Sequence, residues 1–174
     1  MRPSHDEWGL RLAEVVAQRA TCLRRSVGCV LTNARHQVLS TGYNGRASGL
    51  KHCDEAREEG RGYKQFGDDP SVQKPTRIVT VYPPACAGAR APSGHNLDGC
   101  EAIHAEQNAL LQCRNVYEIN ICYVTVSPCV TCVKLLLNTG CMFIVFREPY
   151  AHDEASRLLW LSDRRAWIHL PCAA

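Results

Sequence analysis

The sequence contains no long apolar run and few aromatic residues. No uncharged stretch approaches the roughly 18 residues that a membrane-spanning helix needs, and the first residues, MRPSHDEWGLRL, lack the apolar segment of a secretory signal. Aromatic residues make up 7% of the 174, and 20 basic against 17 acidic residues give a formal net charge of only +3. This balance argues against a strongly cationic duplex-binding surface but suits a small anionic ligand. We therefore expect a cytoplasmic chain with no membrane partner, forming a single domain over residues 1–174.

Cysteine, by contrast, is abundant, with 11 residues in the chain. In the absence of a secretory signal, free thiols indicate metal binding or burial in a core more often than disulfides. Cys29, Cys122 and Cys141 lie in short apolar, β-branched runs, where a cysteine usually packs as a small hydrophobic residue. Cys113 and Cys172 fit no pattern. The cysteines that remain as candidates for chemistry or metal binding are Cys22, Cys53, Cys86, Cys100, Cys129 and Cys132.

Hydrophobic periodicity predicts helices and strands on both sides of a poorly patterned middle region. Residues 6–20 carry apolar side chains at helical spacing, and residues 27–32 and 36–41 are typical of two strands joined by a turn. Farther along the chain strands and helices alternate, which indicates an α/β sheet covered by helices. The elements expected there are a helix from about 104, a strand at 121–126, a helix from about 129, a strand at 141–146, a helix through 153–161 and a strand at 167–170.

The middle region, from Gly42 to Gly99, is rich in glycine, proline and charge, and its one short apolar run is IVTVY. A loop this long without structure is abnormal inside a compact domain. We therefore interpret residues from about 50 to 99 as a long insertion that something other than a hydrophobic core holds in place. Because closing a long loop with a metal offsets entropy that packing cannot, a metal ion is the expected clamp.

Two short motifs carry the strongest chemical signal. His104-Ala105-Glu106 begins a predicted helix, and Pro128-Cys129-Val130-Thr131-Cys132 opens another directly after a strand. At a helix N-terminus the macrodipole and free N–H groups favour a thiolate. Cysteines three residues apart lie on one helical face, so Cys129 and Cys132 can reach one ion, with His104 as the third ligand. Three protein ligands leave a fourth position for water, as catalytic zinc requires.

Glu106 completes a catalytic set. Zinc lowers the pKa of a bound water from about 16 toward 7, but protons must still be moved during the reaction. A carboxylate two residues after the histidine can accept a proton from water, pass it to a ring nitrogen and protonate a leaving amine. H-x-E combined with P-C-x-x-C is a described signature of zinc deaminases that act on cytosine or adenine. The motifs therefore predict hydrolytic deamination with Glu106 as the catalytic residue.

With these motifs the chain resembles the zinc-dependent cytidine and deoxycytidylate deaminase family. The resemblance covers residues from about 5 to 165 and rests on TCLRRSVG, TGYNG, CEAIHAEQNALL and TVSPCVTC. It implies a three-layer α/β/α cytidine-deaminase-like fold with a mixed five-stranded central sheet and a zinc-held insertion. The implied reaction is hydrolysis of a cyclic amidine C–N bond, converting dCMP to dUMP and ammonia and supplying dUMP for thymidylate synthesis. It also implies allosteric control by dCTP and dTTP with Mg²⁺, and a homohexamer.

The resemblance also implies roles for particular residues. Asn44, the asparagine of GYNG, would hydrogen-bond the sugar, and Tyr150 would lie near the bound nucleotide. Several members of the family carry a second, structural zinc held by residues that match Cys22 and Cys53 and by two more from the segment before the H-A-E motif. We expect those two to be Cys86 and Cys100. His95 or His52 could substitute for one of them.

Substrate binding follows only partly from the residues themselves. Arg24, Arg25 and Ser26 precede the first predicted strand, where a loop could wrap a phosphate, and Arg46 follows GYNG. Without the resemblance, the Asn-Gly pair of GYNG is equally typical of a tight turn. The residues alone therefore predict an amino-bearing pyrimidine substrate, in the form of a nucleotide.

Other functions share the same zinc motif. The substrate could be CMP or a 5-substituted dCMP in place of dCMP. A deaminase of cytosine or adenine in nucleic acid would add a basic, aromatic-lined groove, for which the sequence offers no cationic run longer than two residues. We therefore expect no polynucleotide partner. A non-catalytic zinc-stabilised binding module would have a closed four-ligand site and no need for Glu106.

Overall fold

A mixed five-stranded sheet forms the centre of the computed structural model, which describes residues 2–53, 55, 57–60, 79–82, 86–92, 95 and 99–172. Its strands, in chain order, are β1 (Gly28–Thr32), β2 (Val38–Tyr43), β5 (Ile121–Val126), β6 (Phe143–Glu148) and β7 (Ala166–His169). They lie side by side in the order β2-β1-β5-β6-β7. β1 is antiparallel to both of its neighbours, whereas β5, β6 and β7 are parallel.

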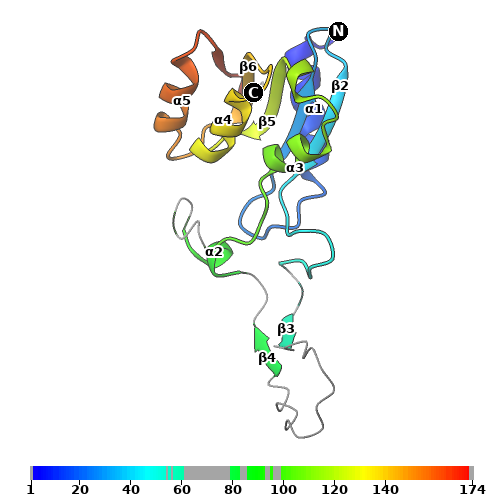
Figure 1. The fold of residues 1–174 in the computed structure, drawn as a ribbon, viewed down its shortest axis with the longest axis vertical. Helices are drawn as coiled ribbons and strands as arrows, with labels where there is room; N and C mark the ends of the chain where they lie inside the picture. The colour runs from blue at the N-terminus through cyan, green and yellow to red at the C-terminus, as the bar shows by residue number, and fades with distance from the viewer. Residues whose placement is uncertain are drawn as a thin grey trace, which may run out of the picture.

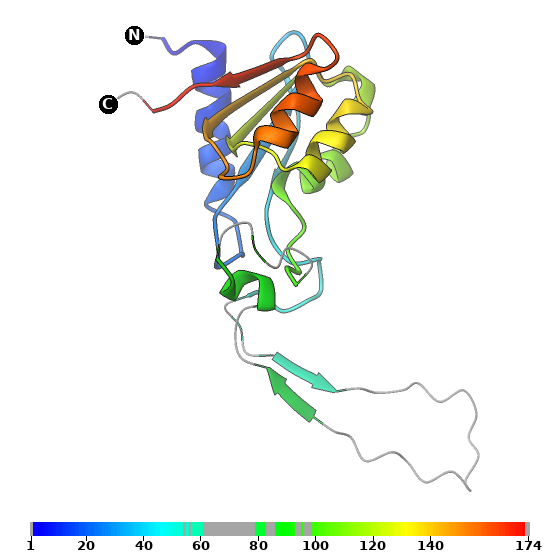
Figure 2. The same ribbon diagram turned by 90° about the vertical axis from the view of Figure 1, so that its left-hand side faces the viewer.

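Helices cover both faces of this sheet, which confirms the predicted three-layer fold. One face is covered by α1 (His5–Ala17), and the other by α3 (Ala105–Gln112), α4 (Val130–Leu137) and α5 (Glu154–Leu161), as Figures 1 and 2 show. A short 3₁₀ helix, η1 (Val116–Glu118), precedes β5. In the part of the chain that the structure describes, no helix combines the length and apolarity needed to cross a membrane.

The strands divide the core into two layers because successive side chains point to opposite faces. Val30 and Tyr123 belong to the cluster that packs against Leu10 of α1. Cys29 and Cys122 belong to the cluster on the side of α3, α4 and α5, with their sulfur atoms 3.6 Å apart. Cys141, in the same cluster, is also fully buried. The prediction that these three cysteines are core residues is confirmed.

Helix α1 is fixed at its beginning and along its length. Ser4 caps it by accepting a hydrogen bond from the Glu7 N–H at 3.1 Å. The buried guanidinium of Arg147, on β6, donates to Glu7 at 2.9 Å and to Glu14 at 2.7 Å. These charge-assisted bonds tie the helix to the parallel part of the sheet. The helix ends at Ala17, three residues before the predicted boundary at residue 20.

The insertion contains more regular structure than its sequence indicates. β3 (Arg57–Gly60) pairs antiparallel with β4 (Val79–Tyr82), and a short helix, α2 (Ala87–Arg90), follows. The two strands project away from the central sheet (Figures 1 and 2). β4 lies in the apolar run IVTVY, for which the sequence analysis predicted no strand, and Arg-Glu-Glu-Gly has no alternation that would predict its partner. Residues 61–78 and several others of the predicted insertion lie outside the described residues.

Candidate active site

The two predicted chemical motifs lie at neighbouring helix beginnings. His104 immediately precedes α3, and Cys129 immediately precedes α4, directly after β5. The Gln107 side chain accepts a hydrogen bond from the His104 backbone N–H at 2.9 Å, which fixes the start of α3. A Cβ atom at Gly42, in β2, would collide with the backbone of Ala105 and Ala109, so α3 can lie this close to the sheet only over a glycine.

Three ligand atoms converge between these helices. The Nδ1 atom of His104 lies 3.5 Å from the Cys129 sulfur and 3.4 Å from the Cys132 sulfur, and the ligand atoms of all three residues lie within 4.8 Å of one another. Tetrahedral zinc with bonds of about 2.0 Å to nitrogen and about 2.3 Å to sulfur would separate nitrogen from sulfur by about 3.5 Å. The set of donor atoms therefore fits zinc in chemistry and in spacing.

The electrostatics of these residues favour a negatively charged sulfur. A hydrogen bond from the Cys132 thiol, followed by one from His104 and one from the Cys132 backbone N–H, lowers the pKa of Cys129 to about 4. The same pairing with Cys129 raises the pKa of His104. A thiolate is the form of cysteine that binds metal, so the local structure already stabilises a ligand state at neutral pH.

Glu106 lies beside this cluster in the first turn of α3. Only 4% of the residue is exposed, and this burial raises the pKa of its carboxyl group, with the charge of His104 acting in the opposite direction. A raised pKa brings a carboxyl group closer to the range in which it can both accept and release protons during a reaction. The environment of Glu106 is therefore suited to general acid–base chemistry.

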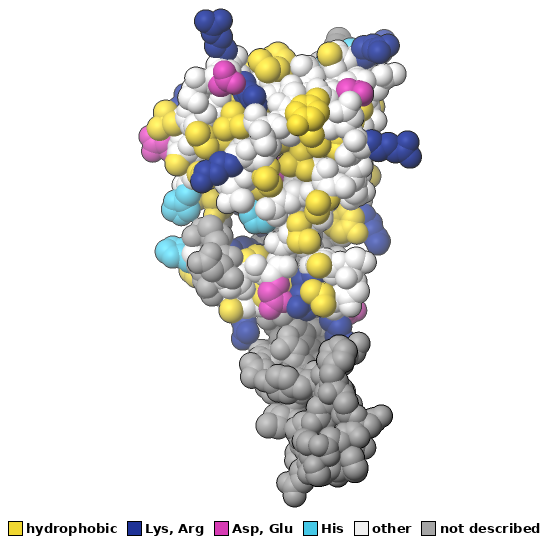
Figure 3. Space-filling view, in the orientation of Figure 1, with side chains coloured by type: hydrophobic (Ala, Val, Ile, Leu, Met, Phe, Trp, Pro, Cys, Tyr) yellow, Lys and Arg dark blue, Asp and Glu magenta, His cyan; other side chains and the backbone are white. Residues whose placement is uncertain are grey.

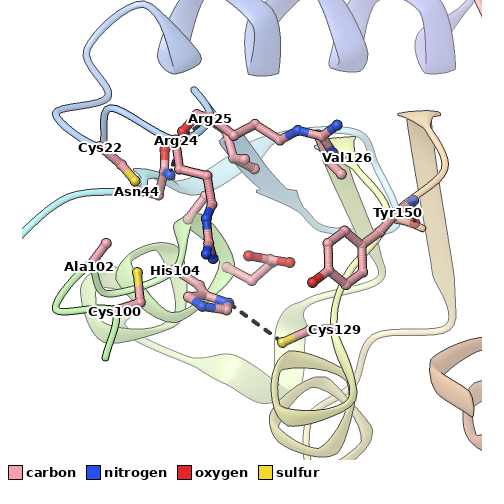
Figure 4. Close-up of a pocket in the computed structure, with 14 residues that line it drawn as sticks. Cys22, Arg24, Arg25, Asn44, Cys100, Ala102, His104, Val126, Cys129 and Tyr150 are labelled. Carbon is pink, nitrogen blue, oxygen red and sulfur yellow. Dashed lines mark hydrogen bonds between the residues drawn. The ribbon is translucent and has the colours of Figure 1, made fainter. Parts of the chain in front are cut away.

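A cavity of about 120 Å³ brings most of the predicted site residues together. His104, Glu106 and Cys129 line it on the catalytic side, and Tyr150 enters from the segment after β6 (Figure 4). The other predicted residues along its wall are Asn44, Arg24, Arg25, Cys22 and Cys100. Ser26 is exposed and does not line this cavity.

Asn44 braces the loop before β1. Its side-chain oxygen accepts a hydrogen bond from the Val27 N–H at 2.8 Å, and its side-chain nitrogen donates to the Arg25 carbonyl at 2.7 Å. An amide has two N–H donors and two lone pairs, so one of each remains for a ligand. The asparagine of GYNG thus shapes the cavity wall and can still contact a sugar.

The three arginines predicted to bind phosphate differ in what they contact. Arg24 donates hydrogen bonds to the carbonyls of Ala91, Pro92 and His95, at 3.2, 3.2 and 2.8 Å, and so fastens the insertion to the cavity wall. Arg25 is half-exposed, and its ionic contact with Glu148 is long, at 3.9 Å. This difference favours Arg25 over Arg24 as a ligand for an incoming anion.

Arg46 lies outside the catalytic cavity. It pairs with Glu101 and donates a hydrogen bond to the Lys51 carbonyl at 2.8 Å. It lines a second, more polar cavity of about 410 Å³, together with Tyr43 and His52. A contact between Arg46 and a substrate in the catalytic cavity therefore has no support from this placement.

The thiols predicted for a second zinc influence one another's pKa, although the ligand atoms that lie close enough to hold a metal ion among the described residues are those of His104, Cys129 and Cys132. Cys86 immediately precedes α2 and accepts a hydrogen bond from the Ala89 N–H at 3.3 Å. Although burial raises its pKa, the Glu101 and Ala89 N–H groups and the thiols of Cys100 and Cys53 together lower it.

The fourth thiol, Cys22, is close enough to act on Cys100. Burial, followed by the charges of Cys86 and Cys22, raises the pKa of Cys100. The substitutes considered from the sequence, His95 and His52, are both exposed. Their exposure therefore argues against either histidine as a substitute for one of the four cysteines.

Ser127 is a residue of this site that the sequence analysis missed. It is 4% exposed and lines the cavity between the end of β5 and Cys129. The one feature of the sequence that could have indicated it is its position immediately before Pro128 and Cys129. A serine at such a position is not by itself evidence of a functional role. Its contacts arise from a segment more than twenty residues away in the sequence, which no local pattern indicates.

Comparison with known proteins identifies the family. The sequence model described as "Cytidine and deoxycytidylate deaminase zinc-binding region" matches residues 3–148. The chain belongs to this family. The deoxycytidylate deaminase of Mycobacterium phage D29 is 32% identical over 146 residues, which cover 83% of this chain and 95% of the phage protein. The family predicted from the sequence motifs is thus confirmed.

One further relative of this deaminase family and one solved structure extend the comparison. The deoxycytidylate deaminase of Saccharomyces cerevisiae is 30% identical over 90% of this chain, but the chain spans only 41% of the length of that yeast protein. A crystal structure of dCMP deaminase from the cyanophage S-TIM5, in complex with dCMP and dUMP, aligns over 98% of this chain and 99% of its own. Its TM-score of 0.64 at 21% identity shows that the fold is shared.

Proposed function

We propose that this deaminase-family chain catalyses the zinc-dependent hydrolysis of dCMP to dUMP and ammonia. The observation that carries the proposal is the position of Glu106, buried beside a His–Cys–Cys donor set in a cavity that Asn44, Arg25 and Tyr150 also line. A binding module stabilised by zinc would have no need for a buried carboxyl group with a raised pKa in that position. The names of the D29 and S-TIM5 relatives support dCMP as the substrate.

The residues of the chain divide the chemistry among them. His104, Cys129 and Cys132 would hold the zinc, which when bound supplies a Lewis acid that makes water nucleophilic near neutral pH. Glu106 accepts one proton from the attacking water and delivers it to N3 of the cytosine ring. It then transfers the second water proton to the exocyclic amine as the C4–N bond breaks. The balance is dCMP plus water giving dUMP plus ammonia.

The remaining residues of the cavity would bind the nucleotide. Asn44 has a free donor and a free acceptor for the sugar, and Tyr150 supplies an aromatic face for the base. Arg25 would contact the phosphate, and Ser26, which follows it in the chain but does not line the cavity, could do so only from outside. Arg24 would act indirectly by holding the insertion against the cavity.

We expect the enzyme to prefer dCMP to deoxycytidine, and Arg25→Gln to remove much of that preference. A charge-assisted contact to phosphate is worth about 1.5–3 kcal/mol, or about 10- to 100-fold in kcat/KM. The variant should therefore raise KM for dCMP by such a factor and leave deoxycytidine almost unaffected. Steady-state ammonia release measures both, with exposed Arg35→Gln as the control. Equal kcat/KM for dCMP and deoxycytidine in the wild type would contradict a phosphate-binding site.

We also propose that Cys22, Cys53, Cys86 and Cys100 hold a second, structural zinc. Their mutual electrostatic influence supports this, since the thiols of Cys53 and Cys100 lower the pKa of Cys86 and the charge of Cys22 raises the pKa of Cys100. An ion with four cysteine ligands has no open position, so its role would be to fix the insertion.

The second zinc predicts a metal content. The purified wild type should contain about two zinc ions per chain, and Cys53→Ser should reduce this to about one and expose the insertion to protease. Exposed Cys172→Ser should change neither quantity. Elemental analysis and limited proteolysis make the two measurements. A wild-type content of one zinc ion that Cys53→Ser leaves unchanged would contradict the proposed site.

Further properties follow from family membership alone. We propose that residues 1–174 act as one deaminase domain in the cytoplasm, that the chain forms a homohexamer, and that dCTP and dTTP with Mg²⁺ regulate it. The product dUMP would serve thymidylate synthesis. Adding each effector to the dCMP assay tests the regulatory part.

The same assay separates dCMP from related substrates. CMP differs from dCMP by the 2′-hydroxyl group of the sugar, and a 5-substituted dCMP differs by a group on C5 of the base. Both compounds are tested in parallel with dCMP. On the face seen in Figure 3, Lys and Arg side chains are scattered over the described surface without forming a stripe. This distribution supports a mononucleotide substrate over a polynucleotide, which needs a continuous basic groove.

A further inference from the structure

Ser127 connects the metal-binding segment to the segment that carries Tyr150. Its hydroxyl group accepts a hydrogen bond from the Tyr150 backbone N–H at 2.6 Å and donates one to Asp153 Oδ2 at 2.7 Å. Its own backbone N–H donates to the Glu148 carbonyl at 2.8 Å. Ser127 lies two residues before Cys129 and is almost fully buried. One small side chain therefore fixes two points of the segment after β6.

Asp153 uses its carboxylate in an unusual way. It occupies the N-cap position of α5, where an aspartate normally accepts a hydrogen bond from the first turn of its own helix, yet its side chain makes no such bond. The carboxylate contacts Ser127 across 26 residues of sequence. The local cap is replaced by a tertiary bond, which holds the start of α5 to the end of β5.

The segment between Tyr150 and Asp153 is a closed turn. The Asp153 N–H donates to the Tyr150 carbonyl at 3.1 Å, so the two residues bound to Ser127 are also bound to each other. The ring of Tyr150 contacts His152 edge-on, with centroids 5.9 Å apart. In Figure 4 the Tyr150 side chain points into the cavity, with its hydroxyl toward Cys129. Any movement of this turn would therefore move the ring within the cavity.

We infer that Ser127 is a positioning residue that holds Tyr150 at the distance from Cys129 and Glu106 at which it contacts the bound base. The inference rests on the proposed deaminase function, because it assigns Tyr150 to the substrate. Ser127 itself touches no reacting atom. Its effect is expected on substrate binding more than on proton transfer, because it acts on the wall of the cavity and not on Glu106.

The first test compares three variants by the kinetics of dCMP deamination. Ser127→Ala leaves the Tyr150 N–H and the Asp153 carboxylate without their partner, and kcat/KM should fall about 10- to 100-fold, mainly through KM. Ser127→Thr retains the hydroxyl group and should restore most of the loss. Ser156→Ala is the matched control, since that hydroxyl is buried in α5 with no hydrogen-bond partner among the described residues. A fall confined to kcat, or no rescue by threonine, would overturn the inference.

The second test is a double-mutant cycle with Tyr150→Ala. If Ser127 acts through Tyr150, adding Ser127→Ala to the Tyr150→Ala variant should cost less than about twofold more in kcat/KM. Independent, multiplying effects would overturn the inference.

A third measurement needs no substrate. Amide hydrogen exchange of the wild type should show protection at Tyr150 that Ser127→Ala removes and Ser156→Ala preserves. If the wild-type protein shows this protection but deaminates no cytosine compound, the proposed function is refuted. The anchoring of the turn by Ser127 is not. Equal exchange at Tyr150 in wild type and Ser127→Ala would refute the anchoring itself.

Discussion

Glu106→Gln should abolish nearly all turnover while the protein keeps its fold and its zinc. Glutamine has the shape of glutamate but cannot accept and release a proton, and general acid–base groups typically supply about 10²- to 10⁴-fold in rate. Because Glu106 would serve more than one proton transfer, the loss in kcat should reach at least the upper part of that range. The measurement is kcat for dCMP together with zinc content and circular dichroism.

The control for this substitution is Glu118→Gln, which changes an exposed glutamate in η1 in the same way. It should retain wild-type kcat. The replacement of a buried carboxyl group by an amide is also not expected to unfold the protein, since burial already disfavours the charged form of Glu106. If Glu106→Gln retained a third of the wild-type kcat, Glu106 would have to be removed from the mechanism.

Cys132→Ser should bring deaminase activity to the background of the assay. The residue is fully buried, and its sulfur lies 3.4 Å from His104 Nδ1, so the substitution removes one of three converging donor atoms. A hydroxyl group is a poor substitute for a thiolate toward zinc, so the catalytic ion should be lost and with it the activation of water. Zinc content should fall by about one ion per chain.

Chelation of the wild type provides the complementary experiment. Activity should disappear with a strong chelator and return on adding Zn²⁺, and not on adding Mg²⁺, which prefers oxygen ligands. The control for Cys132→Ser is Cys113→Ser, at the end of α3, which should keep both zinc and activity. Full activity in Cys132→Ser or in chelated protein would show that the His–Cys–Cys cluster is not the catalytic metal site.

The part of the site that follows from sequence is the part that local spacing determines. Each motif lies within a single turn at the beginning of a helix. The spacing of two residues from His104 to Glu106 and of three residues from Cys129 to Cys132 places their side chains on the expected faces. The order of strands and helices follows from the same periodicity. The convergence of the two motifs needs only that both helices begin at one edge of the sheet, as ligand sites in α/β folds usually do.

Residues whose partners are distant in sequence could not be predicted in this way. Arg24 has the composition and position of a phosphate ligand, but its guanidinium contacts carbonyls of the insertion about 70 residues away. Ser127 bonds to a turn more than 20 residues downstream. β3 pairs with β4 although its own residues show no strand pattern. In each case the contact arises from tertiary packing, which leaves no periodic trace in the sequence.

The direct test of the proposed activity is incubation of purified, zinc-loaded wild type with dCMP, with chromatographic detection of dUMP and enzymatic detection of ammonia. We expect the two products to form in equal amounts, over many turnovers per chain, with Glu106→Gln inactive under the same conditions. Absence of dUMP from the wild-type reaction, at a zinc content showing that the His104, Cys129 and Cys132 site is filled, would contradict the account.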